Sequence, residues 1–307
     1  MTRYAGFPTS AISQASQVTI GVFDGMHRGH TAFLTALATQ AHTAGHDAVV
    51  ITFDPHPDTV VHPDRPVKLL MTPQDRLNHI EACGIDHVIS VAFDQHIQAM
   101  SAADFMHHVV QATNVRTLWV GWDFALGRNR EGTTHRLSEI GQTLGFATQV
   151  VPRLTDTQGE PSSSAIRAAL LNGDMGHVNA LLGHTHYYRG VVTLGDQRGR
   201  TIGFPTANMR IDDRVMLPKF GVYACQIEVA GERFVAVTNI GQRPTFQGST
   251  PRIEAHILDF NCDIYGQQVT LFVHEFIRAE QRFTGVQELV AQIHHDVAHT
   301  RTLHINI

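Results

Sequence analysis

The sequence predicts an α/β protein in two parts: a doubly wound parallel sheet, followed by a small antiparallel β-barrel with a C-terminal helix. In the first half, near-continuous apolar runs alternate with stretches of helical periodicity, as expected for parallel strands covered on both faces. After Leu182 and Gly183 the strands become short and alternating, separated by turn residues, which is typical of a barrel. This change within 307 residues predicts two domains, 1–184 and 185–307.

The first domain is justified by segments that alternate along the chain. Apolar runs predict strands at 18–23, 48–53, 87–93, 117–120 and 147–151. Amphipathic stretches between them predict helices at 31–44, 73–82, 102–112 and 137–144. A sheet of this kind resembles nucleotide-binding sheets, in which the ligand lies at the carboxyl ends of the strands.

The second domain is justified by short strands with turn signals between them. Alternating runs predict strands at 188–194, 221–229, 233–240, 252–259 and 268–275. A last amphipathic segment at 285–303 predicts a helix that packs against the barrel.

Composition excludes several classes of protein. The net charge is -5 and no run of Lys or Arg resembles a nucleic-acid or membrane footprint. The three cysteines are widely spaced, no apolar run approaches ~20 residues, and the N-terminus lacks the pattern of a signal peptide. We therefore expect a cytoplasmic protein with small anionic partners, no nucleic acid and no membrane, and the sequence leaves weak self-association open.

The first motif, VTIGVFDGMHRGH at 18–30, places a Gly turn and two histidines after a strand. Gly25 permits a sharp exit from the strand, and Gly29 lets backbone approach a phosphate. His27 and His30 share one face of a first helical turn, beside its unpaired N–H groups, which suits charge building on a leaving pyrophosphate. The motif predicts nucleotidyl transfer, with His27 and His30 catalytic and with nucleotide binding by Phe23, Asp24, Gly25 and Gly29.

Two further segments support this site. GWDFALGRNREG at 121–132 follows the predicted strand 117–120, so it lies on the same carboxyl edge. PSSSAIR at 161–167 begins a helix, where hydroxyls cap the helix or bind phosphate. Arg167, one turn into this helix, is predicted to be catalytic by binding phosphate.

The second motif, GDQRGRTIGFPTAN at 195–208, predicts a phosphate-binding loop and a metal site. The chain has only two lysines, Lys68 and Lys219, and neither lies in a Gly-rich loop, so a P-loop kinase is excluded. Thr206 and Asn208 offer hard oxygen ligands for Mg²⁺ that bridges ATP phosphates. The residues predicted to bind phosphate beside them are Gly195, Arg200, Gly203 and Pro205.

With these motifs the chain resembles the bacterial bifunctional riboflavin kinase/FAD synthetases. The resemblance runs from about Val18 to Leu303 through GVFDGMHRGH, GWDFALGRNREG, SSSAIR, RGRTIGFPTAN, LPKFGVYA, RPTFQG, RIEAHILDF and DIYG, in the order of that family. It implies an N-terminal FMN adenylyltransferase of the nucleotidyltransferase superfamily and a C-terminal riboflavin kinase barrel.

The resemblance also implies roles for single residues. It implies ATP phosphate contacts for His27 and His30, and it places Asp123, Ser163, Ser164 and Arg167 in the same site, with Ser164 standing where the family usually has Thr. It implies that Glu254, on a strand face opposite Ile253 and Ala255, is the base that activates a hydroxyl. Arg278 matches a family Arg near flavin or phosphate, and a surface ion pair is the alternative.

The expected function is a sequence of two reactions that depend on ATP and Mg²⁺. Riboflavin and ATP would give FMN and ADP in the C-terminal domain, and FMN and ATP would then give FAD and pyrophosphate in the N-terminal domain. The alternatives are a chain with one active domain and a flavin-binding regulator without turnover. The pair His295 and His299 could bind a transition metal by spacing alone, but no third ligand is identifiable, so we assign it no role.

Overall fold

The computed structural model describes residues 1–152, 159–195, 197–245 and 248–303. The chain forms two compact units, Met1–Pro161 and Ser162–Ile307. Asp196 in the second motif, and Phe246 and Gln247 of RPTFQG, lie outside the described residues.

A six-stranded parallel sheet forms the centre of the first unit, in the order β1-β4-β3-β2-β5-β8. Its strands are β1 (Thr2–Ala5), β2 (Ser16–Ile20), β3 (Asp47–Phe53), β4 (His87–Val91), β5 (Val115–Gly121) and β8 (Ala147–Val151). The predicted parallel sheet is confirmed. Strand β1 adds an edge that sequence periodicity did not reveal.

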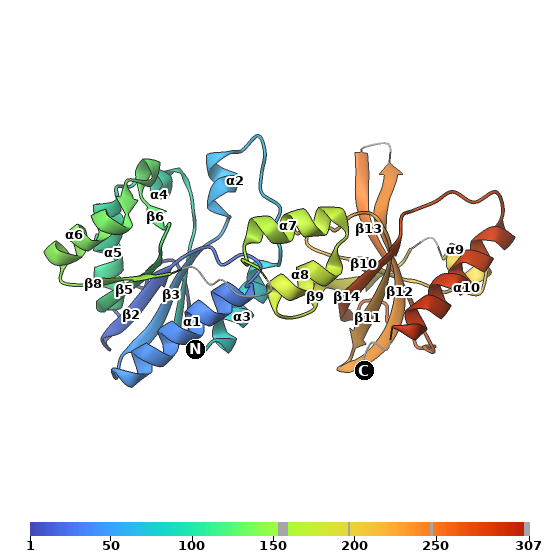
Figure 1. Ribbon diagram of the computed structural model, residues 1–307, viewed down its shortest axis with the longest axis horizontal. Coiled ribbons are helices and arrows are strands. Elements are labelled where there is room, and N and C mark those ends of the chain that lie inside the picture. Colours follow the sequence, from blue (N-terminus) through green and yellow to red (C-terminus); the bar gives the residue numbers. More distant parts are fainter. Residues whose placement is uncertain (153–158, 196, 246–247, 304–307) are drawn as a thin grey trace. The chain divides into compact units, whose positions relative to one another are not determined.

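Helices cover both faces of this sheet (Figure 1). Leu34 and Leu37 of α1 (Arg28–Thr43) and Ile80 of α3 (Pro73–Ala82) belong to one apolar cluster. Phe105 of α5 (Ala102–Thr113) and Leu137 of α6 (Thr134–Leu144) belong to the other. The sheet is thus buried on both sides, which explains why its strands are near-continuous apolar runs.

The strand order reverses between β2 and β5. From β2 the chain adds β3 and then β4 on one side, and it crosses over to add β5 and β8 on the other. Ligands of open α/β sheets bind in the crevice at such a point, outside the carboxyl ends of the strands. The first motif continues from the carboxyl end of β2, and GWDFALGRNREG continues from the carboxyl end of β5, so the fold brings both motifs to this edge of the sheet. Short elements follow three of the strands at this edge. After β3 comes α2 (Pro57–Val61), after β4 comes α4 (Gln95–Ala99), and after β5 come β6 (Ala125–Leu126), a 3₁₀ turn (Arg128–Arg130) and β7 (Gly132–Thr133).

The second unit contains a closed six-stranded barrel in the order β10-β13-β12-β11-β14-β9. The strands are β9 (His186–Thr193), β10 (Ala207–Arg210), β11 (Gly221–Val229), β12 (Glu232–Thr245), β13 (Gly248–Ile257) and β14 (Gln268–Arg278), and all of their pairings are antiparallel. Helix α10 (Val286–Thr302) follows the last strand, and a single turn, α9 (Arg198–Thr201), lies in the second motif. The predicted barrel and C-terminal helix are confirmed.

Two helices that precede the barrel, α7 (Ser163–Asn172) and α8 (Met175–Leu182), belong to the second compact unit. The Lys219 N–H donates to the Leu170 carbonyl at 2.8 Å, and Asn179 Nδ2 donates to the Val273 carbonyl at 3.3 Å. The predicted boundary at 184 therefore marks the start of the barrel, whereas the compact unit begins earlier. As a boundary of function, 184 stays a prediction. Among the described residues, no helix combines the length and the apolar character needed to span a bilayer.

Candidate active sites

His27 and His30 lie together at the start of α1. His27 is the N-cap, and its Nδ1 accepts a hydrogen bond from the His30 backbone N–H at 3.3 Å. The two imidazoles are stacked, with ring centroids 3.6 Å apart, and Phe23 meets the His30 ring edge-on at 5.2 Å. The predicted pairing of the two rings beside a helix N-terminus is present in the structure.

Both rings are neutral at pH 7. Burial lowers the pKa of His27 to about 4, with a small further lowering from the Arg28 charge. Burial likewise holds the pKa of His30 well below its usual value, and His27 adds to the effect. Since His27 Nδ1 accepts a hydrogen bond, its proton is on Nε2. The pair therefore offers neutral N–H donors, while the helix terminus supplies the positive field.

The turn between β2 and α1 depends on residues that tolerate unusual backbone. Gly25 has φ +82°, and a Cβ there would meet Leu70 Cδ1 at 2.6 Å. A Cβ at Gly29 would meet the His27 ring at 3.2 Å, so this glycine leaves room for the imidazole. The buried carboxylate of Asp24 accepts from the Leu70 N–H at 3.0 and 3.1 Å, which fixes the turn. Nucleotide binding by these residues stays a prediction.

A cavity of about 900 Å³ lies at the carboxyl ends of β2, β3, β4 and β5. Asp123 lines it, and Arg130 Nη2 donates to the Asp123 carbonyl at 3.3 Å. Sequence reasoning missed most of the lining, which includes the aromatic side chains Phe53, Phe93, Phe105 and Phe124 and the cations Arg128 and Arg130. Phe124, Arg128 and Arg130 lie in the GWDFALGRNREG motif, whereas no motif marks Phe53, Phe93 and Phe105.

The three serines of PSSSAIR occupy different positions at the start of α7. Ser162 is the N-cap, and its hydroxyl accepts from the Ala165 N–H at 3.1 Å. Ser163 and Ser164 are the first two residues of the helix, and Arg167 follows one turn later. Capping is thus done by the serine before the predicted pair, which leaves phosphate binding by Ser163, Ser164 and Arg167 as a prediction.

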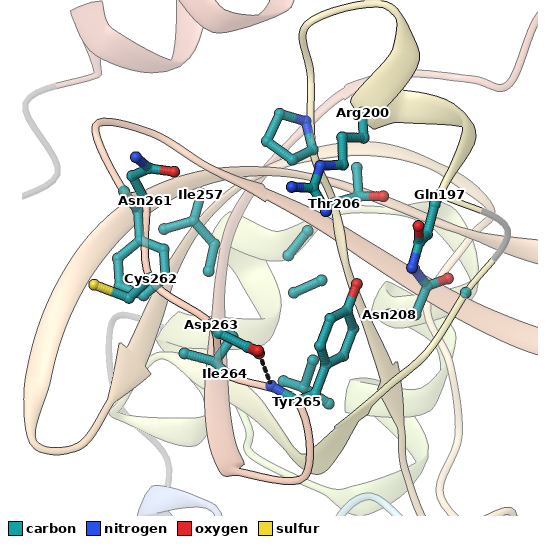
Figure 2. Close-up of a pocket in the computed structure, with 16 residues that line it drawn as sticks. Gln197, Arg200, Thr206, Asn208, Ile257, Asn261, Cys262, Asp263, Ile264 and Tyr265 are labelled. Carbon is teal, nitrogen blue, oxygen red and sulfur yellow. Dashed lines mark hydrogen bonds between the residues drawn. The ribbon is translucent and has the colours of Figure 1, made fainter.

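In the second unit, most of the predicted metal and phosphate residues line one cavity of about 350 Å³, whose lining is polar and apolar in similar measure (Figure 2). Thr206 and Asn208 lie on its wall, together with Gly195, Arg200 and Pro205. A Cβ at Gly195 would overlap the Asn208 amide, so only glycine allows this approach. Gly203, with φ +89°, makes the turn before them and is not among the lining residues. The cavity also has a wall, which includes residues of the RIEAHILDF and DIYG motifs, for which no site role was predicted; it is formed by Phe260, Asn261, Cys262, Asp263, Ile264 and Tyr265.

A second cavity of about 330 Å³ adjoins the first at Thr206, which lines both. Glu254 lines this second cavity, with Phe204, Phe283, Leu289 and Ile293 providing apolar walls. On β13, Glu254 lies directly opposite Asn208 of β10. The next-door residues Ile253 and Ala255 are buried, which confirms that Glu254 faces away from the apolar side of its strand.

Arg278 also lines the second cavity, but its guanidinium is held by a carboxylate. Nε donates to Asp296 Oδ1 and Oδ2 at 3.0 and 3.1 Å, and Nη2 donates to Oδ2 at 2.8 Å. The Asp296 side chain is 1% exposed, so the alternative of an ion pair is present in a buried form that ties α10 to β14. Contact with flavin stays a prediction.

Metal ligands in the barrel are few. Across the parts of the chain that the structure describes, no three His, Cys, Asp or Glu side chains gather to hold a metal ion. His299 Nε2 contacts Glu275 Oε1 at 3.1 Å, so this histidine has a structural partner. The hydroxyl of Thr206 and the amide oxygen of Asn208 remain the candidate donors, and they suit a cation that takes most of its ligands from phosphate and water.

Comparison with known proteins identifies two enzyme families along the chain. A family model described as FAD synthetase matches residues 9–165, and one described as riboflavin kinase matches residues 182–304. The bifunctional riboflavin kinase/FMN adenylyltransferase of Bacillus subtilis (strain 168) is 37% identical over 92% of this chain and 90% of its own. That of Escherichia coli (strain K12) is 37% identical over 93% of each.

A crystal structure from Streptococcus pneumoniae, described as a macrolide-efflux protein, has the same fold. It superposes with a TM-score of 0.88 at 30% identity, over 97% of this chain and 98% of that one. The matched family models occur in the order of the two units, and the curated relatives cover nearly the whole chain. The chain therefore belongs to the family of bifunctional riboflavin kinase/FMN adenylyltransferases.

Proposed function

We propose that this chain phosphorylates riboflavin in its C-terminal unit and adenylylates the resulting FMN at the carboxyl edge of its N-terminal sheet. The observation that carries the kinase assignment is that Thr206 lines two adjoining cavities, one with mixed polar and apolar lining and one that is largely apolar. A nucleotide in the first cavity and a flavin in the second would meet at Thr206, beside Asn208 and opposite Glu254.

In the kinase step, Glu254 accepts the proton of the ribityl hydroxyl while the oxygen of that hydroxyl forms a bond to the γ-phosphorus of ATP. The bond from that phosphorus to the β,γ-bridging oxygen breaks, and ADP leaves. Thr206 and Asn208 would hold Mg²⁺, which neutralises charge on the ATP phosphates when bound. Gly195 and Arg200 face the same cavity and bind phosphate oxygens.

In the adenylylation step, the phosphate of FMN attacks the α-phosphorus of ATP and pyrophosphate leaves, so no protein nucleophile is needed. His27 and His30 donate N–H groups to the leaving oxygens, beside the positive end of α1. The cavity of about 900 Å³ has four phenylalanines for an isoalloxazine ring and two arginines for a phosphate. Its size and lining support FMN as its occupant.

Incubation of the pure protein with riboflavin and Mg·ATP tests this proposal, with FMN and FAD separated over time. We expect FMN to rise first and FAD to follow. Glu254→Gln should slow FMN formation by about 10² to 10⁴, because Gln cannot accept the proton, and supplied FMN should still become FAD at the normal rate. A protein that makes neither product would refute the proposal.

The two activities should separate on fragments. We expect residues 162–307 to phosphorylate riboflavin and to make no FAD, since α7 and α8 accompany the barrel. Residues 185–307 should show the same activity with a lower midpoint of thermal unfolding, because they lack the contacts to Leu170 and Asn179. FAD formation by either fragment would contradict the assignment of the units.

A further inference from the structure

Arg252 lies on the same face of β13 as Glu254, at the junction of the two kinase cavities. Its Nη2 donates to Glu254 Oε1, and its Nε donates to Asn208 Oδ1 at 3.4 Å. Arg252 and Glu254 both line the cavity that we assign to the flavin, and Asn208 lines the cavity that we assign to the nucleotide. One guanidinium therefore joins the candidate base to a candidate metal ligand.

The register of the strands beside β13 determines which side chains lie next to Arg252 and Glu254. Asn208 of β10 and Asn239 of β12 are the two cross-strand neighbours of Glu254. Arg252 is opposite Gly241, where the Glu280 carboxylate occupies the place that a Cβ would take. The side chains of Arg252 and Glu254 are 29% and 20% exposed, so their contact is partly shielded from water.

Other charged groups of this cavity have partners elsewhere. The Arg278 guanidinium is held by the buried carboxylate of Asp296. Glu280 Oε1 accepts from Asn239 Nδ2 at 3.2 Å. Arg252, by contrast, contacts Glu254 directly.

We propose that Arg252 is a positioning residue of the kinase. It holds the Glu254 carboxylate at a fixed place relative to Asn208, so that the base and the substrate hydroxyl are aligned with the phosphate that is transferred. The inference rests on the role of Glu254 proposed above. A glutamate has three rotatable side-chain bonds, and the planar fork of arginine restricts them through directed hydrogen bonds. A neighbouring positive charge weakens a carboxylate as a base, so the benefit of Arg252 is geometric.

Loss of Arg252 should reduce turnover more than binding. Small misplacement of a catalytic group costs up to about 10²-fold in rate, so Arg252→Met should lower kcat of riboflavin phosphorylation by about 10- to 100-fold. Methionine keeps the apolar stem that packs in the cavity, so KM for riboflavin and for ATP should change by no more than about twofold. Arg252→Lys should be intermediate, because an ammonium reaches one partner and lacks the fork.

A double-mutant cycle in the full chain is the decisive experiment. Wild type, Arg252→Met, Glu254→Gln and the double variant are compared for kcat with riboflavin and Mg·ATP. If Arg252 acts through Glu254, adding Arg252→Met to Glu254→Gln should cost no further activity. Arg233→Ala is the matched control, since Arg233 pairs with Glu228 at 3.3 Å outside both cavities; its kcat should equal that of wild type.

Three results would overturn the inference. Wild-type kcat in Arg252→Met would show that the bridge has no catalytic value. Losses that multiply in the double variant would show that Arg252 acts on the phosphate independently of Glu254. A rise in KM with unchanged kcat would make it a binding residue. Wild-type kcat in Glu254→Gln would instead refute the base assignment itself, so the two failures are distinguishable.

Discussion

Replacing His27 by Asn removes a titrating ring from the start of α1 and keeps a side chain that caps helices well. In the native protein, burial holds the pKa of His27 at about 4, against 6.5 for a free imidazole. Between these values the unfolded chain binds a proton that the native protein does not. The contribution of neutral His27 to the free energy of unfolding is therefore fully present above pH 6.5 and is lost as the pH falls toward 4.

The magnitude follows from the difference between the two pKa values. At 1.36 kcal/mol per pKa unit, the stabilisation reaches roughly 3 kcal/mol in full, and most of it is lost by pH 4.5. His27 is 7% exposed, so solvent screening is slight. We expect wild type to lose about 2 kcal/mol more than His27→Asn between pH 7 and pH 4.5.

Urea unfolding followed by tryptophan fluorescence measures this quantity. Both tryptophans of the chain, Trp119 and Trp122, lie in the first unit with His27, so the signal reports that unit. His135→Asn is the control, because the His135 side chain is 86% exposed and its removal should leave the pH dependence of wild type. Parallel losses in wild type and His27→Asn would show that His27 is not held neutral by burial.

The remaining predictions concern the two reactions. Replacing His27 and His30 together by Ala should slow adenylylation by ~10² or more, the scale for lost preorganised donors, so FMN should accumulate from riboflavin; an unchanged FAD yield would remove both from the mechanism. Gly195→Ala should displace the Asn208 amide and lower kinase turnover, with conversion of supplied FMN as the internal control. Chelation of Mg²⁺ by excess EDTA should stop both reactions, and added Mg²⁺ should restore them; persistence of either reaction would contradict its metal dependence.

The sheet and barrel were predictable because their strands have strong local patterns. Strand β1 escaped prediction since its four residues, TRYA, are mostly exposed and carry no apolar run. Strand β10 is only four residues long and follows Pro205, so no alternating run marks it in the sequence. Its identity as a strand comes from pairing with β9 and β13. Helices α7 and α8 were assigned to the first domain by chain order, because periodicity does not reveal the surface on which a helix packs.

The site residues that could be predicted are those whose residue type and spacing indicate a specific chemistry. His27, His30, Thr206 and Asn208 stand in short motifs whose spacing has a physical meaning. Phe53, Phe93 and Phe105 do not, since they come from a strand, a loop and a helix that meet only when the sheet is assembled. The contact of Arg252 with Asn208 depends on the register between β10 and β13, and no local pattern encodes that register.

Of the described residues, Thr206 alone lines both kinase cavities. If ATP and riboflavin bind as proposed above, each substrate has its own cavity, and occupation of one leaves the other free. Riboflavin and ATP should then add in either order, and initial-rate plots at varied concentrations should intersect, as in a random sequential mechanism. The phosphoryl group would pass directly from one cavity to the other, so the parallel lines of a ping-pong mechanism are not expected. A high concentration of one substrate should not inhibit by competing for the place of the other.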